Sequence, residues 1–155
     1  MDCWVIDASV YLALHLGEKR FAKALNSVIE DYLQGVILPL APTIQHYEIM
    51  SGLQTVVSRG KIGPYIIDEA MADTFELEIE YRTIYLNYEH LSRFCRQYKC
   101  TVYNAAYLVL AEQEKARFLT ADKKLYKVLH PHLDWVIWLG DYPKIGKKNL
   151  KHRVS

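Results

Sequence analysis

Short apolar runs alternate with longer amphipathic segments along the chain. The apolar runs have the length of buried strands and occupy residues 4–6, 36–39, 117–120 and 135–139. Between them, apolar residues recur at helical spacing, which predicts helices over residues 9–16, 20–33, 42–57, 64–74 and 84–98, another that Asn104 caps, and a short one after Asp122. Nearly continuous apolar strands that alternate with helices are typical of a parallel sheet covered on both faces. We therefore predict an α/β fold with a central parallel sheet.

Three of these segments carry more specific expectations. Residues 75–81 alternate strictly between apolar and acidic residues, which predicts a strand at the sheet edge with one wet face. The helix near Asn104 is apolar almost all round, as a buried helix would be. In the helix over residues 42–57, the side chains expected to face the core are Ile44, Tyr47, Leu53 and Val57.

Length and composition predict one domain and a basic tail. The chain has 155 residues, of which 51% are hydrophobic, enough for a single core. We place the domain at residues 1–143 and the tail at residues 144–155, which contain five basic residues and no acid. Without those five, 14 basic residues stand against 18 acidic ones, a net charge of −4. The tail is either a phosphate-binding segment or an ordinary solvated terminus.

Cysteine content and hydropathy favour a cytoplasmic location. The three cysteines form neither an even disulfide set nor a C-x-x-C metal motif, which is typical of a reducing compartment. The N-terminus has no basic leader, and we identify no apolar stretch of membrane-spanning length. We therefore expect no membrane partner.

Aspartates stand where two of the predicted strands end. Asp7 follows the first apolar run, and Asp122 follows the run at residues 117–120. Open parallel sheets bind ligands beyond the carboxyl ends of their strands, so neighbouring strands would bring the two carboxylates into one cleft. Such a pair of oxygen ligands favours Mg²⁺ or Mn²⁺ over zinc. The alternative is that each aspartate simply caps the helix that follows it.

Four motifs, in order along the chain, resemble the PIN domain, in particular the VapC-type toxins of bacterial and archaeal toxin–antitoxin pairs. They are V-I-D-A-S-V (residues 5–10), H-Y-E-I (46–49), Y-N-A-A-Y-L-V-L-A-E (103–112) and L-T-A-D-K-K-L (119–125). The resemblance implies a three-layer α/β/α fold and an endoribonuclease that depends on Mg²⁺ or Mn²⁺. It also implies an RNA substrate, an antitoxin protein as partner, and a homodimer.

Site residues follow from matching positions in these motifs. Asp7 matches the first acid of the family, Glu48 the acid on the helix, and Asp122 the acid of the T-A-D motif. The resemblance implies that Asp7 and Asp122 contact the metal and that Glu48 is an outer ligand or helps to deprotonate water. Asn104 stands where the family usually has aspartate. An amide oxygen can bind Mg²⁺ but brings no charge, so we expect a weakened or more metal-demanding nuclease.

Supporting roles are expected for further polar residues. Ser9 and Thr120 are candidates for hydrogen bonds at the site, and Asp141 is a candidate to replace the missing charge, although a turn aspartate is the simpler interpretation. Candidate RNA-phosphate contacts, each equally ordinary as a solvated charge, are Lys123, Lys124, Arg59 and Lys61. His46 is expected to be an exposed helical residue.

Two other classes of function remain as alternatives. A PIN-fold module without catalysis would bind RNA or a protein through the same cleft, and Asn104 is the feature that favours it. A metal-dependent phosphatase or phosphotransfer receiver is less favoured, because no cluster of acids follows Ile6.

Overall fold

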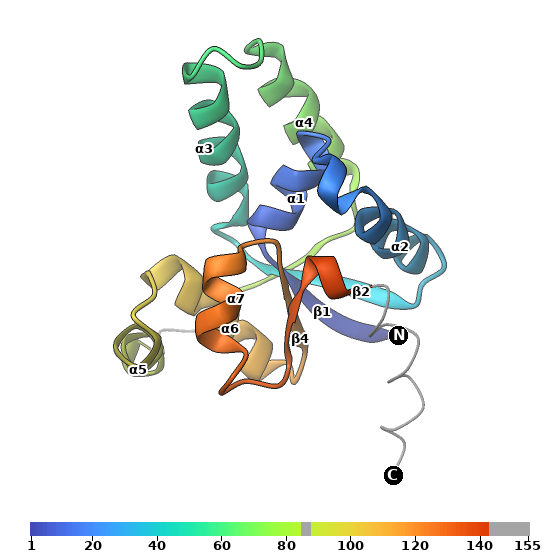
Figure 1. The fold of residues 1–155 in the computed structure, drawn as a ribbon. Helices are drawn as coiled ribbons and strands as arrows, with labels where there is room; N and C mark the ends of the chain where they lie inside the picture. Colours follow the sequence, from blue (N-terminus) through green and yellow to red (C-terminus); the bar gives the residue numbers. More distant parts are fainter. Residues whose placement is uncertain (85–87, 143–155) are drawn as a thin grey trace.

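A computed structural model describes residues 1–84 and 88–142 of the chain (Figure 1). Within these residues five strands form one sheet in the order β3-β2-β1-β4-β5, and every neighbouring pair is parallel. The strands are β1 (Asp2–Ile6), β2 (Ile37–Pro42), β3 (Glu80–Arg82), β4 (Arg117–Thr120) and β5 (Val136–Trp138). The predicted parallel sheet is confirmed. The basic tail, residues 144–155, lies outside the described residues.

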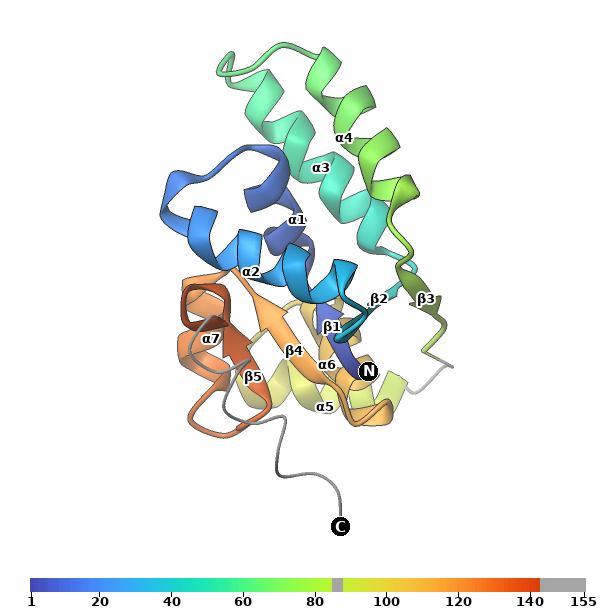
Figure 2. The same cartoon turned by 90° about the vertical axis from the view of Figure 1, so that its right-hand side faces the viewer.

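Helices cover both faces of this sheet, as predicted. Figure 2 shows α1 to α4 on one side of the strands and α5 and α6 on the other, while α7 packs against β4 and β5. No helix in the described part of the chain is long and apolar enough to cross a membrane. The helices are α1 (Ala8–His15), the 3-10 helix η1 (Lys19–Phe21), α2 (Ala22–Leu33), α3 (Gln45–Ser58), α4 (Tyr65–Glu76), α5 (Tyr88–Tyr98), α6 (Val102–Gln113), α7 (Lys123–Leu129) and the 3-10 helix η2 (Leu139–Asp141).

The core lies where the apolar pattern places it. Each residue of α6 from Ala105 to Ala111 is buried, which confirms the prediction of a helix that is apolar almost all round. The chain leaves α2 and α3 through Gly35 and Gly60, whose φ angles of 67° and 70° are readily adopted only by glycine. Because it is buried over these residues, α6 packs against β1, β2 and β4.

The structure corrects two predictions of local structure. Helix α4 continues through Glu76, and only Glu80–Arg82 pairs as the edge strand, so the strand predicted over residues 75–81 is too long. The buried residues of α4, Ala70, Met71 and Thr74, lie just before this segment and anchor the last turn of the helix, whereas an edge strand gains hydrogen bonds from one side only. Asn104 is not the cap of α6, because Thr101 takes that place and its hydroxyl accepts from the Asn104 amide at 3.1 Å.

The strand order creates a crevice between β1 and β4. From β1 the chain crosses toward β2, whereas from β4 it crosses toward β5 on the opposite side. The two connections therefore leave their strands in opposite directions, and ligands of open α/β sheets bind at this kind of switch point. Asp7 follows β1 and Asp122 follows β4, so they flank this point.

We expect Gly52→Val to destabilise the fold, because α3 crosses α1 closely at this glycine. A Cβ at position 52 would lie 2.5 Å from Leu12 Cδ1. Overpacking of this kind costs about 1–3 kcal/mol, which thermal denaturation would detect as a lower Tm. Gln54→Val, at an exposed position of the same helix, is the matched control and should leave the Tm nearly unchanged. Equal Tm values for the two variants would contradict the close crossing.

Candidate functional site

The carboxyl ends of β1 and β4 bring Asp7 and Thr120 together. Ile6 lies opposite Leu119 in the parallel ladder, and the Asp7 amide donates to the Leu119 carbonyl at 2.9 Å. The Asp7 side chain is only 5% exposed, whereas Asp122, two residues beyond Thr120, is exposed. The strands that precede the two aspartates are neighbours in the sheet, which is the condition for the two carboxylates to share one cleft. The site thus has a buried acid at its floor and an exposed acid at its rim.

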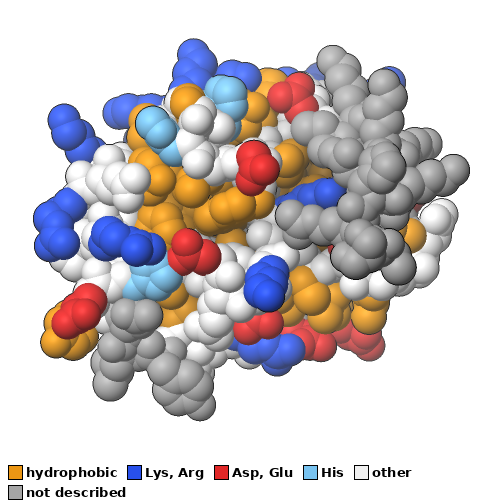
Figure 3. Space-filling model, turned by 90° about the horizontal axis from the view of Figure 1, so that it is seen from below, with side chains coloured by type: hydrophobic (Ala, Val, Ile, Leu, Met, Phe, Trp, Pro, Cys, Tyr) orange, Lys and Arg blue, Asp and Glu red, His pale blue; other side chains and the backbone are white. Residues whose placement is uncertain are grey.

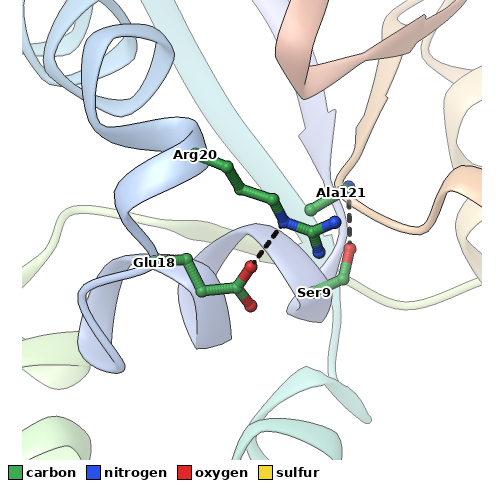
Figure 4. Close-up of polar contacts among 4 residues, drawn as sticks. All are labelled: Ser9, Glu18, Arg20 and Ala121. Atoms are coloured by element: carbon green, nitrogen blue, oxygen red, sulfur yellow. Dashed lines mark hydrogen bonds and ion pairs between the residues drawn. The ribbon is translucent and has the colours of Figure 1, made fainter.

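Two hydroxyl groups hold the Asp7 carboxylate. Ser9 and Thr120 both donate to Asp7 Oδ2, at 2.7 Å and 2.8 Å. Each hydroxyl also accepts from the β4–α7 turn: Ser9 from the Ala121 amide at 2.9 Å (Figure 4), and Thr120 from the Asp122 amide at 3.0 Å. The orientation of Asp7 is therefore tied to the turn that carries Asp122.

The capping alternative holds for one aspartate and not for the other. Asp122 is the N-cap of α7, and its Oδ1 accepts from the Leu125 amide at 3.0 Å. Asp7 occupies the N-cap position of α1, but its side chain makes no capping hydrogen bond. Because the Asp7 carboxylate is directed to Ser9 and Thr120 instead, helix capping does not account for its burial.

Burial dominates the electrostatics of the two inner acids. It raises the pKa of Asp7, the hydrogen bonds from Ser9 and Thr120 oppose this effect, and the charge of Asp122 adds to it. Burial also raises the pKa of Glu48. The charge of Asp7 acts in the same direction, whereas the Tyr107 hydroxyl acts against it. The negative charges are therefore close enough to repel one another, which a bound cation would relieve.

Gln45 and Tyr107 complete the floor of the site, and the sequence pattern gave no sign of either. Gln45 Nε2 donates to the Ile6 carbonyl at 2.6 Å, which fixes the start of α3 against the end of β1. Burial raises the pKa of Tyr107, and the charges of Asp7 and Glu48 raise it further. Within the described residues four buried side-chain oxygens have no hydrogen-bond partner of normal geometry, and three of them lie here: Gln45 Oε1, Glu48 Oε1 and the Tyr107 hydroxyl.

Asn104 lies on α6 one turn before Tyr107. Residues three apart share a helix face, so the half-buried Asn104 is on the same side of α6 as the tyrosine beside Asp7 and Glu48. Tyr103 lines a surface hollow together with Glu48 of α3. The N-terminus of α6 is therefore next to the start of α3. In Figure 1, α6 and α7 lie below α3.

These residues suit a hard cation that keeps some of its water. Among residues 1–84 and 88–142, no group of three or more His, Cys, Asp or Glu side chains lies close enough together to hold a metal. Mg²⁺ commonly uses only one or two carboxylates and completes its shell with water and substrate phosphate oxygens. The unpaired oxygens of Glu48 and Gln45 and the repulsion between the acids fit an ion of this kind.

The other predicted site residues lie apart from Asp7. Asp141 is in η2, which packs against η1 and α2 beyond the end of β5. Lys123 and Lys124 are exposed at the start of α7, and Lys123 Nζ lies 3.3 Å from the centroid of the Trp138 ring. Arg59 and Lys61 are in the exposed turn after α3, about 16 Å along the helix from Glu48.

Four of the described histidines pack against aromatic side chains, and His15 instead shares a hydrogen bond with the Thr74 hydroxyl. His46, predicted to be exposed, is half-buried, and its ring lies 4.7 Å from that of Phe75 and 4.3 Å from that of Tyr81. The His130 ring stacks on Tyr126 at 4.6 Å. Seen from below, histidine side chains border a hydrophobic area (Figure 3). The chemistry at the β1–β4 crevice is therefore that of carboxylates, an amide and hydroxyls.

No protein-family model matches the chain, and no curated protein matches it at a significant level.

Proposed function

We propose that this protein is a PIN-domain endoribonuclease of the VapC type that uses Mg²⁺ or Mn²⁺. One observation carries the proposal: the buried Asp7 and the half-buried Glu48 lie within electrostatic reach of each other at the β1–β4 switch point, where Asp122 stands at the rim. Burying charged carboxylates together is costly unless they have a ligand. The order of the four motifs supports the same family.

In the proposed mechanism each side chain has a separate task. Asp7 and Asp122 would hold the cation, and Ser9 and Thr120 keep Asp7 in position through their hydrogen bonds. When bound, the cation supplies a reactive water for in-line attack on phosphorus and charge that steadies the leaving oxygen. Glu48, with one unpaired oxygen, accepts the proton of the attacking water.

The remaining parts of the proposal rest on resemblance and on charge. Lys123 and Lys124 begin the helix that Asp122 caps, so they can meet RNA phosphates at the rim. Arg59 and Lys61 would contact RNA farther along α3. A cytoplasmic location, inhibition by an antitoxin protein and assembly as a homodimer belong to the same proposal.

A PIN-fold RNA- or protein-binding module without catalysis is the second candidate. It is favoured by Asn104, which leaves this face of α6 with an amide where the family pattern has an acid. In this case the cleft would bind RNA without cutting it.

We expect the purified protein to cut a pool of structured RNAs in the presence of Mn²⁺ or Mg²⁺, and we expect this cleavage to stop when EDTA removes the metal. Glu48→Gln, purified in the same way, is the control against a contaminating nuclease, and it should lose activity by about 100–10,000-fold because its amide cannot accept the proton. Cleavage that survives EDTA, or that is equal in the Glu48→Gln preparation, would refute the proposed catalysis.

A further inference from the structure

Two exposed tyrosines form the walls of the hollow beside Glu48. Tyr47 comes from α3 and Tyr103 from α6, and the rest of the lining is Ile44, Glu48 and Ser51. Tyr47 is 78% exposed and Tyr103 57% exposed. Tyr47 was expected to face the core, so its position corrects the sequence-based prediction. A single exposed tyrosine is ordinary, but two rings that line one hollow form a surface on which a ligand can pack.

These two rings are available to a ligand. Within residues 1–84 and 88–142, neither ring stacks on another aromatic ring, whereas the ring of His46, next to Tyr47 in the chain, packs against Phe75 and Tyr81. The hollow reaches the Glu48 carboxylate itself. A group held between Tyr47 and Tyr103 would therefore lie next to the acids of the β1–β4 crevice.

The charge along α3 suits a nucleic-acid strand. Glu48 is the sole charged residue of this helix, and its exposed positions beyond Tyr47 carry neutral groups, among them Ser51, Gln54 and Thr55. The turn that follows is basic, with Arg59 and Lys61. Along α3 itself, a polyanion thus passes from the basic turn to the hollow without an acid of this helix before Glu48.

We propose that Tyr47 and Tyr103 hold an unpaired nucleotide of an RNA strand by stacking on its base, next to Glu48. This inference rests on the proposed function. In an A-form duplex the bases are stacked inside and their faces are closed to side chains, so only an unpaired base can reach an aromatic wall. Both tyrosines are positioning residues, because they contact the base and not the reacting phosphate.

The test is binding of a short, unstructured, fluorescein-labelled RNA in EDTA, where cleavage is off. We expect Tyr47→Ala and Tyr103→Ala each to weaken binding by about 5–150-fold, the range measured for loss of one base–aromatic stack. Tyr47→Phe and Tyr103→Phe keep the ring and should bind like the unmodified protein. Tyr88→Ala is the matched control, because Tyr88 is 69% exposed and begins α5, away from the hollow. The perfect duplex of the same sequence should bind more weakly than the single strand.

The outcomes separate this inference from the proposed catalysis. Loss of binding in both alanine variants, with none in Tyr88→Ala, supports the stacking site even if the protein cuts no RNA. Unchanged binding in the alanine variants, equal affinity for the duplex, or no RNA binding at all would overturn it, even if metal-dependent cleavage is observed. A protein segment would then be the better candidate for the hollow.

Discussion

Asp7→Asn should lower RNA cleavage by more than about 100-fold, since even partners outside the metal shell cost about 10–100-fold when they are lost. Asp7 is the buried acid at the switch point, and its Oδ2 is fixed by Ser9 and Thr120. Asparagine has nearly the same shape and can still accept from both hydroxyls with its one oxygen, so the loss reports on the missing charge and on the missing second oxygen. Initial rates on one RNA substrate, over a series of Mn²⁺ concentrations, measure the effect.

The same substitution should make the metal-free protein more stable at neutral pH. Burial raises the pKa of Asp7 above its usual 3.8, so the folded protein binds this proton more tightly than the unfolded chain does. Burial of Asp7 therefore does not lower the free energy of unfolding below that usual pKa. The loss of stability develops as the pH rises from there through the folded-state pKa. A tenfold difference in proton affinity between the two states is worth about 1.4 kcal/mol, and each kcal/mol raises Tm by about 2–4 °C.

Asp122→Asn is the matched control for stability. It removes the same charge from an exposed residue, and asparagine can still cap α7, so we expect no gain in Tm at neutral pH. The gain in Asp7→Asn should shrink as the pH falls through the usual pKa of 3.8 and disappear at about pH 2–3, where the Asp7 carboxyl group is protonated in both the folded and the unfolded protein. A Tm that falls in Asp7→Asn, or cleavage that is unchanged, would contradict the role given to Asp7.

Asn104→Asp should increase cleavage at limiting Mn²⁺ by about 10–100-fold, the range expected for a group that tunes a metal site. The substitution adds a carboxylate on the face of α6 that carries Tyr107, beside Asp7 and Glu48. It falls in the first turn of the helix, where the helix dipole favours a negative charge, so the fold should tolerate it. Calorimetric titration should show tighter Mn²⁺ binding as well.

Gln113→Glu adds the same charge at the opposite end of α6 and is the control for net charge. It should change neither cleavage nor Mn²⁺ binding. Equal activity in the unmodified protein and in Asn104→Asp would show that the amide already serves as a full ligand. Two tight Mn²⁺ sites in the unmodified protein would contradict the view that Asn104 weakens this site.

The fold could largely be predicted because its strands are apolar throughout. Residues 117–120, for example, form β4 with the bounds predicted, since an apolar run between a helix and a polar turn has few other placements. The strand over residues 75–81 was mispredicted because the alternation of these residues fits a strand. In the structure α4 continues through Glu76, because the buried Ala70, Met71 and Thr74 anchor its last turns in the core.

Only those residues of the site that stand at the end of a strand could be predicted from the sequence pattern. Asp7 and Asp122 follow from strand ends, but their separation depends on β1 lying beside β4, which no local pattern encodes. Gln45 and Tyr107 were missed because a single polar atom in a buried helix leaves no periodic signal. Tyr47 was placed in the core because the spacing of apolar residues cannot tell a buried ring from one that lines a hollow.

The most direct test of the central claim is the chemistry of the cut ends. If a water held at the Asp7 site attacks phosphorus, cleavage requires Mn²⁺ or Mg²⁺, leaves no 2′,3′-cyclic phosphate, and persists when the ribose at the cut site lacks its 2′-hydroxyl. We predict this result for the unmodified protein and for Asn104→Asp, with the latter faster. Cyclic phosphate ends, or cleavage lost with that 2′-hydroxyl, would mean that the ribose itself attacks and that the acidic site does not perform the reaction.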